Sequence, residues 1–166
     1  MAGREKALGV DHPNTLSTVN NIASVFTTQR QYEKALEWYE RVLAGAEKAL
    51  GVDHTDTLTA VNNMASVFGK QGQYGKVLEC YQWVLAGSEK ALGVDHPDTL
   101  TTVNNMTSIP QNQGQYKKAL ELYERVLAGR QKALGMGHTD TLTIVNNMVV
   151  VFHKQGQYKK ALEFCE

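Results

Sequence analysis

Apolar residues between Thr57 and Phe68 recur with the spacing of one face of an α-helix. At about 100° per residue they share one stripe about 120° wide. The members of this stripe are Leu58, Val61, Met64, Ala65 and Phe68. The pattern predicts an amphipathic helix with this stripe in the core, and Asp56 precedes it as the expected N-cap.

A second amphipathic pattern follows a break in the sequence. The segment "KQGQY" interrupts the first pattern, and Gly72 is placed to end that helix and form a turn. The second helix is expected from about Tyr74 to Leu92, and "GVDHPDT" ends it. Its predicted core residues are Val77, Leu78, Tyr81, Val84 and Leu85. No stretch of useful length alternates with a period of two, so the chain is predicted to be all-α.

The same pair of helices is repeated along the chain. Four histidines are spaced 42 residues apart, at His12, His54, His96 and His138. In this register 28 of 42 positions are identical between the first two units. We expect one domain over residues 1–166, with repeats at about 9–50, 51–92, 93–134 and 135–166, and with 1–8 ending a preceding repeat. The residues equivalent to Asp56, and so the other expected N-caps, are Asn14, Asp98 and Asp140.

The unit resembles a tetratricopeptide repeat. The resemblance is carried by the spacing of Val61, Met64, Ala65, Phe68, Gly72, Tyr74, Val77 and Tyr81. With 42 residues, "NN" in the first helix and "ALGxDHPDT" between units, it is similar to the kinesin light chain-like and nephrocystin-like type found in fungal and bacterial signalling proteins. The resemblance implies a right-handed α-solenoid of antiparallel helix pairs, with the first helices lining a concave surface.

The two ends of the sequence correspond to partial second helices. "MAGREKALG" matches the end of one, and "YKKALEFCE" matches the beginning of another. We interpret the chain as part of a longer array with an open apolar face at each end. A natural truncation is the alternative interpretation.

Charge and composition narrow the classes of partner. Lys plus Arg and Asp plus Glu both number 17, so no basic excess favours nucleic acid or an anionic membrane. The longest apolar run, 148–152, is far too short to span a bilayer, and no secretory leader is visible. Two cysteines, Cys80 and Cys165, do not form a disulfide framework. We expect a cytoplasmic protein in which both are core thiols.

A polar stripe beside the core face is the candidate binding surface. Relative to Val61, Asn62 lies about 100° round the helix and Ser66 about 140°. In the families resembled, this surface of the first helix holds extended peptides, and side-chain amides can both donate to and accept from a peptide backbone. The predicted peptide-binding residues are Asn20, Ser24, Asn62, Ser66, Asn104, Ser108 and Asn146, with Lys70 and Lys154 placed to favour an acidic ligand residue.

An alternative role for the asparagines is structural. They could instead bond to neighbouring helices and hold the register between repeats. Asn63 lies about 200° round the helix, and we expect it to be a flanking or inter-repeat residue. Identical side chains in every unit fit both interpretations, because every unit also has the same neighbours.

Nothing in the sequence indicates catalysis, a cofactor or a metal site. Histidines in successive repeats are separated by about the 8–10 Å between packed helices, which is too far for shared zinc ligation. Each is interpreted as a loop residue that supports the turn. No phosphate-binding or nucleophile motif occurs, and repeated glutamates such as Glu79 are expected to face solvent.

A few positions depart from the repeat. Pro110 stands where other units have Phe, and we expect it to kink or shorten its helix because proline lacks an N–H. Arg30 replaces the turn glycine, and Trp83 replaces an arginine and is expected to be exposed. Val149 and Val150 replace Ala-Ser and make the fourth segment more apolar. Such differences either set ligand preference or reflect drift.

These observations predict a non-enzymatic scaffold that binds an extended peptide in its concave groove. The alternative is a self-assembling or spacer segment of a larger signalling protein, in which the open ends associate head to tail. The partners expected are therefore a protein or peptide, or other copies of this chain.

Overall fold

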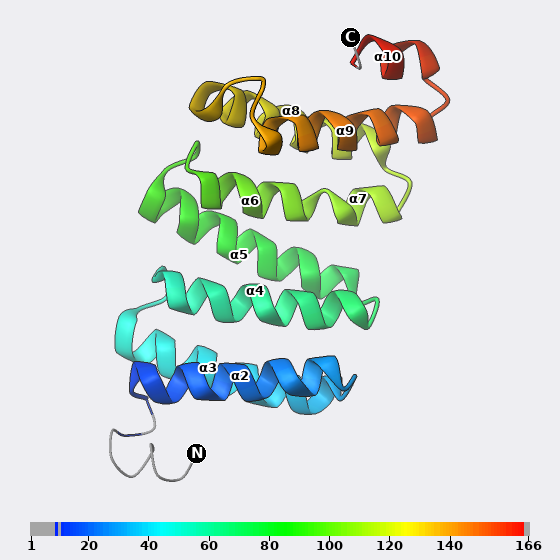
Figure 1. Ribbon diagram of the computed structural model, residues 1–166. Helices are drawn as coiled ribbons and strands as arrows, with labels where there is room; N and C mark the ends of the chain where they lie inside the picture. Colours follow the sequence, from blue (N-terminus) through cyan, green and yellow to red (C-terminus); the bar gives the residue numbers. More distant parts are fainter. Residues whose placement is uncertain (1–8, 10, 165–166) are drawn as a thin grey trace. The chain divides into compact units, whose positions relative to one another are not determined.

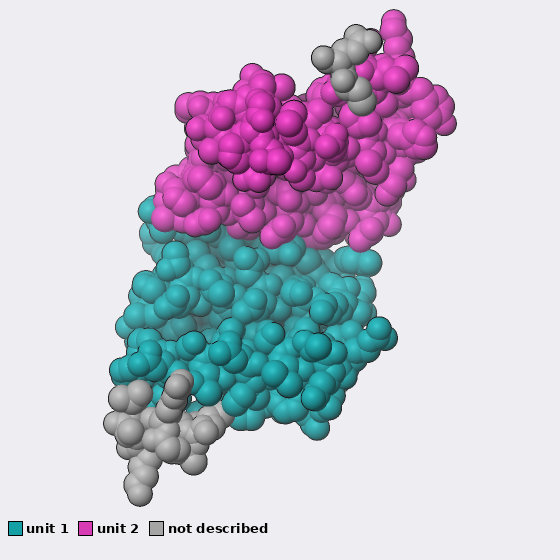
Figure 2. All heavy atoms as spheres, viewed as in Figure 1, with its two compact units in different colours: residues 1–91 teal, residues 92–166 magenta. Residues whose placement is uncertain are grey.

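A computed structural model of the chain describes residue 9 and residues 11–164, and every regular element in these ranges is a helix (Figure 1). The chain divides into two compact units, Met1–Ala91 and Leu92–Glu166 (Figure 2). The helices that begin in the first unit are α2 (Pro13–Thr28), α3 (Tyr32–Leu50), α4 (Thr55–Lys70) and α5 (Tyr74–Leu92). Those of the second are α6 (Pro97–Met106), α7 (Ser108–Asn112), α8 (Tyr116–Leu134), α9 (Thr139–Lys154) and α10 (Tyr158–Glu163). The all-α fold class is confirmed.

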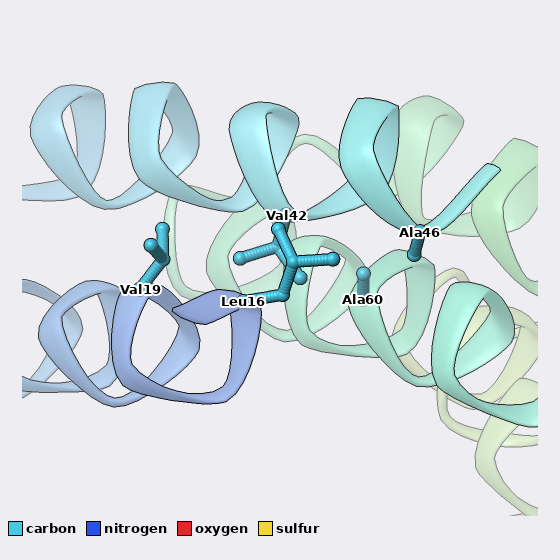
Figure 3. Packing of buried hydrophobic residues seen from close by; sticks show 5 residues of the cluster. All are labelled: Leu16, Val19, Val42, Ala46 and Ala60. Atoms are coloured by element: carbon cyan, nitrogen blue, oxygen red, sulfur yellow. The ribbon is translucent and has the colours of Figure 1, made fainter. Parts of the chain in front are cut away.

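In the first unit, α3 packs between its neighbours α2 and α4. Leu16 of α2 is directed at Val42 of α3, while Ala46 of α3 lies beside Ala60 of α4 (Figure 3). These side chains are buried, and a neighbouring cluster joins α4 to α5 through Leu58, Val61 and Val84. Burial of apolar surface at about 25 cal/mol per Å² is the main force that holds each helix against the next.

Within each of the first three repeats, a glycine on the second helix allows close approach of a leucine from the first helix. A Cβ atom placed on Gly45 would lie 2.6 Å from Leu16 Cδ2, and one on Gly129 would lie 2.6 Å from Leu100 Cδ1. The equivalent distance from Gly87 to Leu58 Cδ2 is 2.8 Å. These separations are shorter than van der Waals contact, so the glycine is needed to pack the leucine as it stands.

The second unit repeats this packing with one interruption. The helix α8 contacts α6, α7 and α9, and α10 contacts α9 (Figure 1). The largest fully buried side chains of the second unit are Leu100, Val103, Val126, Ile144, Met148 and Val151. The first helix of the third repeat is broken at Thr107 into α6 and α7, with Pro110 buried in α7. The expectation that Pro110 kinks or shortens its helix is confirmed as a break three residues before the proline.

The N-cap residues of the first helices are histidines, so the prediction of Asp56 and its equivalents as N-caps was wrong. His54 Nδ1 accepts a hydrogen bond of 3.2 Å from the backbone N–H of Asp56, and His96 Nδ1 does the same for Asp98. The remaining two N-caps are His12 and His138. Acceptance at Nδ1 requires the neutral imidazole with its proton on Nε2. The histidine therefore takes the place that Asp or Asn would take, and the aspartate follows inside the first turn.

We predict that His54→Ala lowers the free energy of unfolding by about 1 kcal/mol, because one N–H of the first turn of α4 loses its acceptor. His54→Ser retains an acceptor oxygen and should stay within about 0.5 kcal/mol of the parent chain. Urea denaturation followed by circular dichroism measures both. Equal losses in the two variants would show that the imidazole contributes by packing and not by capping.

In the first three repeats a buried threonine closes the turn that precedes the first helix, whereas Thr141 Oγ1 in the fourth has no hydrogen-bond partner among the described residues. Thr57 Oγ1 donates to the carbonyl oxygen of Gly51 at 2.7 Å, and Thr99 Oγ1 donates to that of Gly93 at 2.9 Å. An exposed lysine on the second helix reinforces the same turn: Lys132 Nζ lies 2.8 Å from an oxygen of Asp95, and this contact raises the pKa of Lys132. Because the lysine is exposed, this pair contributes less to stability than the buried threonine does.

Most predictions about burial are confirmed. All five residues of the apolar stripe of α4 are buried, as are Val77 and Val84 of α5. Leu78 is 37% exposed, so its assignment to the core was wrong, and Trp83 is half-buried instead of exposed. Arg30 has a φ of 59°, in the left-handed region where the other units place a glycine.

Candidate functional site

The predicted binding residues lie on the first helix of each repeat. Asn20 belongs to α2, Asn62 to α4 and Asn104 to α6, and all three are half-buried, whereas Asn146 of α9 is exposed. The remaining members are exposed, namely Ser24, Ser66, Ser108, Lys70 and Lys154. Each first helix therefore presents an accessible serine or valine one turn after its asparagine. Val150, which replaces the serine in α9, is 50% exposed.

One asparagine of this series is used between repeats. Asn63 Nδ2 of α4 donates to Asn20 Oδ1 of α2 at 2.8 Å. The contact agrees with the expectation that Asn63 is an inter-repeat residue. The contact also gives Asn20 a structural role. A primary amide has two N–H donors and two acceptor sites on its oxygen, and this hydrogen bond uses one of the two acceptor sites of Asn20.

The third repeat shows the opposite situation at the equivalent position. Asn104 Oδ1 is buried and has no hydrogen-bond partner among the described residues. An unpaired buried acceptor costs about 1–3 kcal/mol. A hydrogen bond from a donor to the Asn104 oxygen, formed after the side chain rotates outward or the donor approaches, would therefore be favourable.

A pocket of about 390 Å³ opens between α2 and α4, with α3 behind it. Ser17 and Asn20 of α2 and Thr59 of α4 contribute polar groups to its wall, while Val42 and Ala46 of α3 are part of its apolar lining. Its volume lies in the range of about 300–1,000 Å³ that is usual for ligand pockets. The candidate residue Asn20 is thus part of a recessed surface that can hold a side chain.

Asp56 is the one ionisable group among the described residues that line this pocket. Its side chain is 67% exposed and lies 3.9 Å from Nδ1 of His54. Nδ1 of His54 accepts a hydrogen bond from the backbone N–H of Asp56, so this nitrogen does not donate to the carboxylate. The pocket therefore carries a net negative charge at its rim.

Sequence reasoning missed Arg130, which occupies the equivalent place in the second unit. It stands 84 residues after Ala46, at the same position of the repeat, and Ser88 holds that position in the repeat between. Arg130 Nη1 donates to the carbonyl oxygen of Asp140 at 3.2 Å, and Nη2 donates to Thr101 Oγ1 at 3.4 Å. The signal was present in the sequence, because this position changes from Ala to Ser to Arg while the glycine before it is the same in all three repeats.

Cys80, the cysteine that the described residues include, does not belong to the candidate binding residues. Cys80 of α5 is half-buried and packs against the cluster of Leu58, Val61 and Val84. Burial raises the pKa of its thiol, and the carboxylate of Glu79 raises it further. These features agree with the interpretation of Cys80 as a core thiol. Cys165 lies outside the described residues.

The described part of the chain holds no group of three or more side chains arranged to bind a metal ion. None of its helices combines the length and the apolar character needed to cross a bilayer. The polar groups of the candidate binding residues are hydroxyls, amides and the ammonium groups of Lys70 and Lys154, which are suited to hydrogen bonding with another polypeptide.

The sequence matches the tetratricopeptide repeat family over residues 1–48, 14–90 and 98–166, so the chain belongs to this family. No match was found among curated protein sequences. Among solved structures, one from Podosopora anserina, with nearly identical TPR-like repeats of the kinesin light chain type, is similar with a TM-score of 0.81 and 27% identity. The similarity covers 99% of this chain and 78% of that one.

Two more distant structures share the fold alone. BtubC (BKLC) from P. vanneervenii has a TM-score of 0.78 and 21% identity, over 90% of this chain and 60% of that one. A Rap protein complexed with Competence and Sporulation Factor has a TM-score of 0.64 and 18% identity, over 96% of this chain and 52% of that one. The kinesin light chain-like tetratricopeptide character expected from the 42-residue unit is confirmed.

Proposed function

We propose that the chain is a non-enzymatic scaffold that binds an extended segment of a partner protein along the face formed by its first helices. The observation that carries the proposal is the pocket between α2 and α4, because the candidate residue Asn20 and the hydroxyls of Ser17 and Thr59 line one recess. A peptide backbone needs alternating donors and acceptors, and side-chain amides and hydroxyls supply both.

Further support comes from the state of the amides and from a relative. The unpaired oxygen of Asn104 is buried, and a backbone N–H of the ligand would satisfy it once the amide rotates toward the surface. The Rap structure shows one protein of this fold in complex with another factor. By extension, the stripe of Asn62, Asn146 and the exposed serines would extend the contact from repeat to repeat.

A peptide-library selection tests the proposal. The parent chain is compared with a variant in which Asn20, Asn62, Asn104 and Asn146 are all alanine, after circular dichroism shows that it is folded. The matched control replaces Glu37, Glu79 and Glu121 with alanine, because these residues are exposed on the second helices. We expect the parent and the control to enrich the same peptides. The asparagine variant should bind these peptides at least tenfold more weakly than the parent does.

The contact between Asn20 and Asn63 could make the fourfold variant unstable. A second variant therefore places tyrosine at the exposed positions Ser24 and Ser66, which blocks the same face and keeps the contact between Asn20 and Asn63. Unchanged peptide affinity in this variant would overturn the proposal.

Self-association is the second candidate function, and the exposed apolar side chains of α10 favour it. Tyr158 is 60% exposed and Leu162 is 66% exposed. If assembly is the function, the selection enriches no peptide and the mass measured by sedimentation rises with concentration. Leu162→Lys would then reduce that mass, whereas the asparagine variant would leave it unchanged.

A further inference from the structure

The two units provide two versions of the same pocket, one open and one filled. In the first unit, Ala46 of the second helix α3 lines the pocket between α2 and α4, and its small side chain leaves the pocket open. In the second unit, the equivalent residue is Arg130, whose side chain is only 14% exposed. The chain itself therefore shows which kind of side chain this place in the repeat accommodates.

The partners of Arg130 all have equivalents in the open pocket. Thr101, which accepts from Nη2, corresponds to Ser17, and Asp140, whose carbonyl accepts from Nη1, corresponds to Asp56. The carboxylate of Asp140 also lies 4.0 Å from Nη1. Ser17 and Asp56 both line the open pocket, and Asp56 carries the charge at its rim.

We infer that the pocket between α2 and α4 binds the side chain of an arginine in the ligand, and that the residue at positions 46 and 130 decides which repeat accepts one. This inference rests on the proposed function for the ligand as a whole. The aliphatic stem would lie against Val42 and Ala46, and the guanidinium would donate to Ser17 and to Asp56. In the second unit Arg130 already fills this place, so that repeat excludes a ligand arginine.

Arginine fits the arrangement better than lysine does. The contacts of Arg130 diverge from two nitrogens of one planar group, toward a hydroxyl on one helix and a carbonyl and carboxylate on another. A guanidinium has donors fixed in this fork, whereas an ammonium is a compact point charge. An uncharged analogue of the same shape loses the attraction to Asp56 and one set of donors.

The test uses the full chain labelled with ¹⁵N and the probe N-acetyl-arginine-N′-methylamide, with the lysine and citrulline equivalents as comparisons. We expect saturable shifts of the amide signals of Ser17, Asn20, Asp56 and Thr59. The affinity for the citrulline compound should be at least fivefold weaker than for the arginine compound, with lysine in between. Equal affinities for arginine and citrulline would overturn the inference.

Two substitutions exchange the states of the pockets. Ala46→Arg should abolish the shifts around α2 and α4, because the new side chain fills the pocket as Arg130 does in the second unit. Arg130→Ala should add a second set of shifts at Thr101, Asn104 and Asp140. Shifts that persist unchanged in Ala46→Arg would show that the probe binds elsewhere.

A third substitution keeps the test decisive if Ala46→Arg does not fold. Asp56→Asn changes an exposed side chain and leaves the backbone N–H that His54 caps. It should weaken arginine binding at least fivefold, whereas Glu37→Gln, an equal change of charge at an exposed site outside the pocket, should not. Equal effects of the two changes would reduce the interaction to general electrostatics and overturn the inference.

The outcome is separable from that of the proposed function. If enriched peptides lack arginine but lose affinity in the asparagine variant, the inference falls and the peptide scaffold stands. If the arginine probe binds as expected and no peptide is enriched, the pocket stands and the scaffold falls.

Discussion

Replacing Leu100 with alanine is expected to lower the free energy of unfolding by about 2–5 kcal/mol. Leu100 is 1% exposed, and its Cδ1 atom lies close enough to Gly129 that a Cβ there would be only 2.6 Å away. Truncation removes the buried methyl groups and leaves a cavity between α6 and α8 that the surrounding helices fill only in part. Urea denaturation measures the loss.

The chain contains a matched control for this prediction. Leu142 is the equivalent residue in the next repeat, but it is 45% exposed. Leu142→Ala should therefore cost less than about 1 kcal/mol. A similar loss at both sites would show that the close contact with the glycine is not the source of the stability.

A double-mutant cycle isolates the contact with the glycine. Gly129→Ala alone gains up to about 1 kcal/mol of helix propensity but forces Leu100 to move. In the Leu100→Ala background the same change meets no obstacle and should be stabilising. We expect an interaction energy of about 1 kcal/mol between the two sites, and additive effects would contradict this description.

Replacing Pro110 with phenylalanine is expected to raise the free energy of unfolding by about 2–3 kcal/mol. The change restores the backbone N–H that proline lacks and returns the aromatic residue found at Phe26, Phe68 and Phe152. α6 and α7 should then join into one helix, which the Cα chemical shifts around Thr107 would report. Thermal and urea denaturation measure the gain in stability.

Two further variants separate the causes. Pro110→Ala restores the N–H without the ring and should recover the helix with a smaller gain. Phe152→Pro makes the reverse change in the next repeat, where the ring is 6% exposed and contacts Phe164, and should cost about 3 kcal/mol or more. Unchanged helix content in Pro110→Phe would show that Thr107, and not the proline, breaks the helix.

Much of the fold follows from local pattern. The second helix expected from about Tyr74 to Leu92 is α5, and the apolar stripe of the first helix is buried as predicted. These predictions succeed because the 3.6-residue period recurs in every unit and the turn glycine in all but the first, and both are strong local signals. The break near Pro110 was equally predictable, because proline acts on its own helix.

The errors concern side chains whose role depends on geometry between segments. Histidine is not a common N-cap residue, so Asp56 was the natural candidate, although the fixed spacing of the histidines indicated a role in the turn. Arg130 was missed for a related reason. Its position lies on a second helix, and only the packing of helices shows that its side chain reaches Thr101 and Asp140 on two first helices.

Contact mapping shows directly whether the first helices bind an extended peptide. The measurement is the change in the amide spectrum of the ¹⁵N-labelled full chain when an enriched peptide is added. The account predicts shifts that follow Asn20, Asn62, Asn104 and Asn146 and their neighbouring serines. Shifts confined to the second helices, or to the exposed apolar residues of α10, would contradict it.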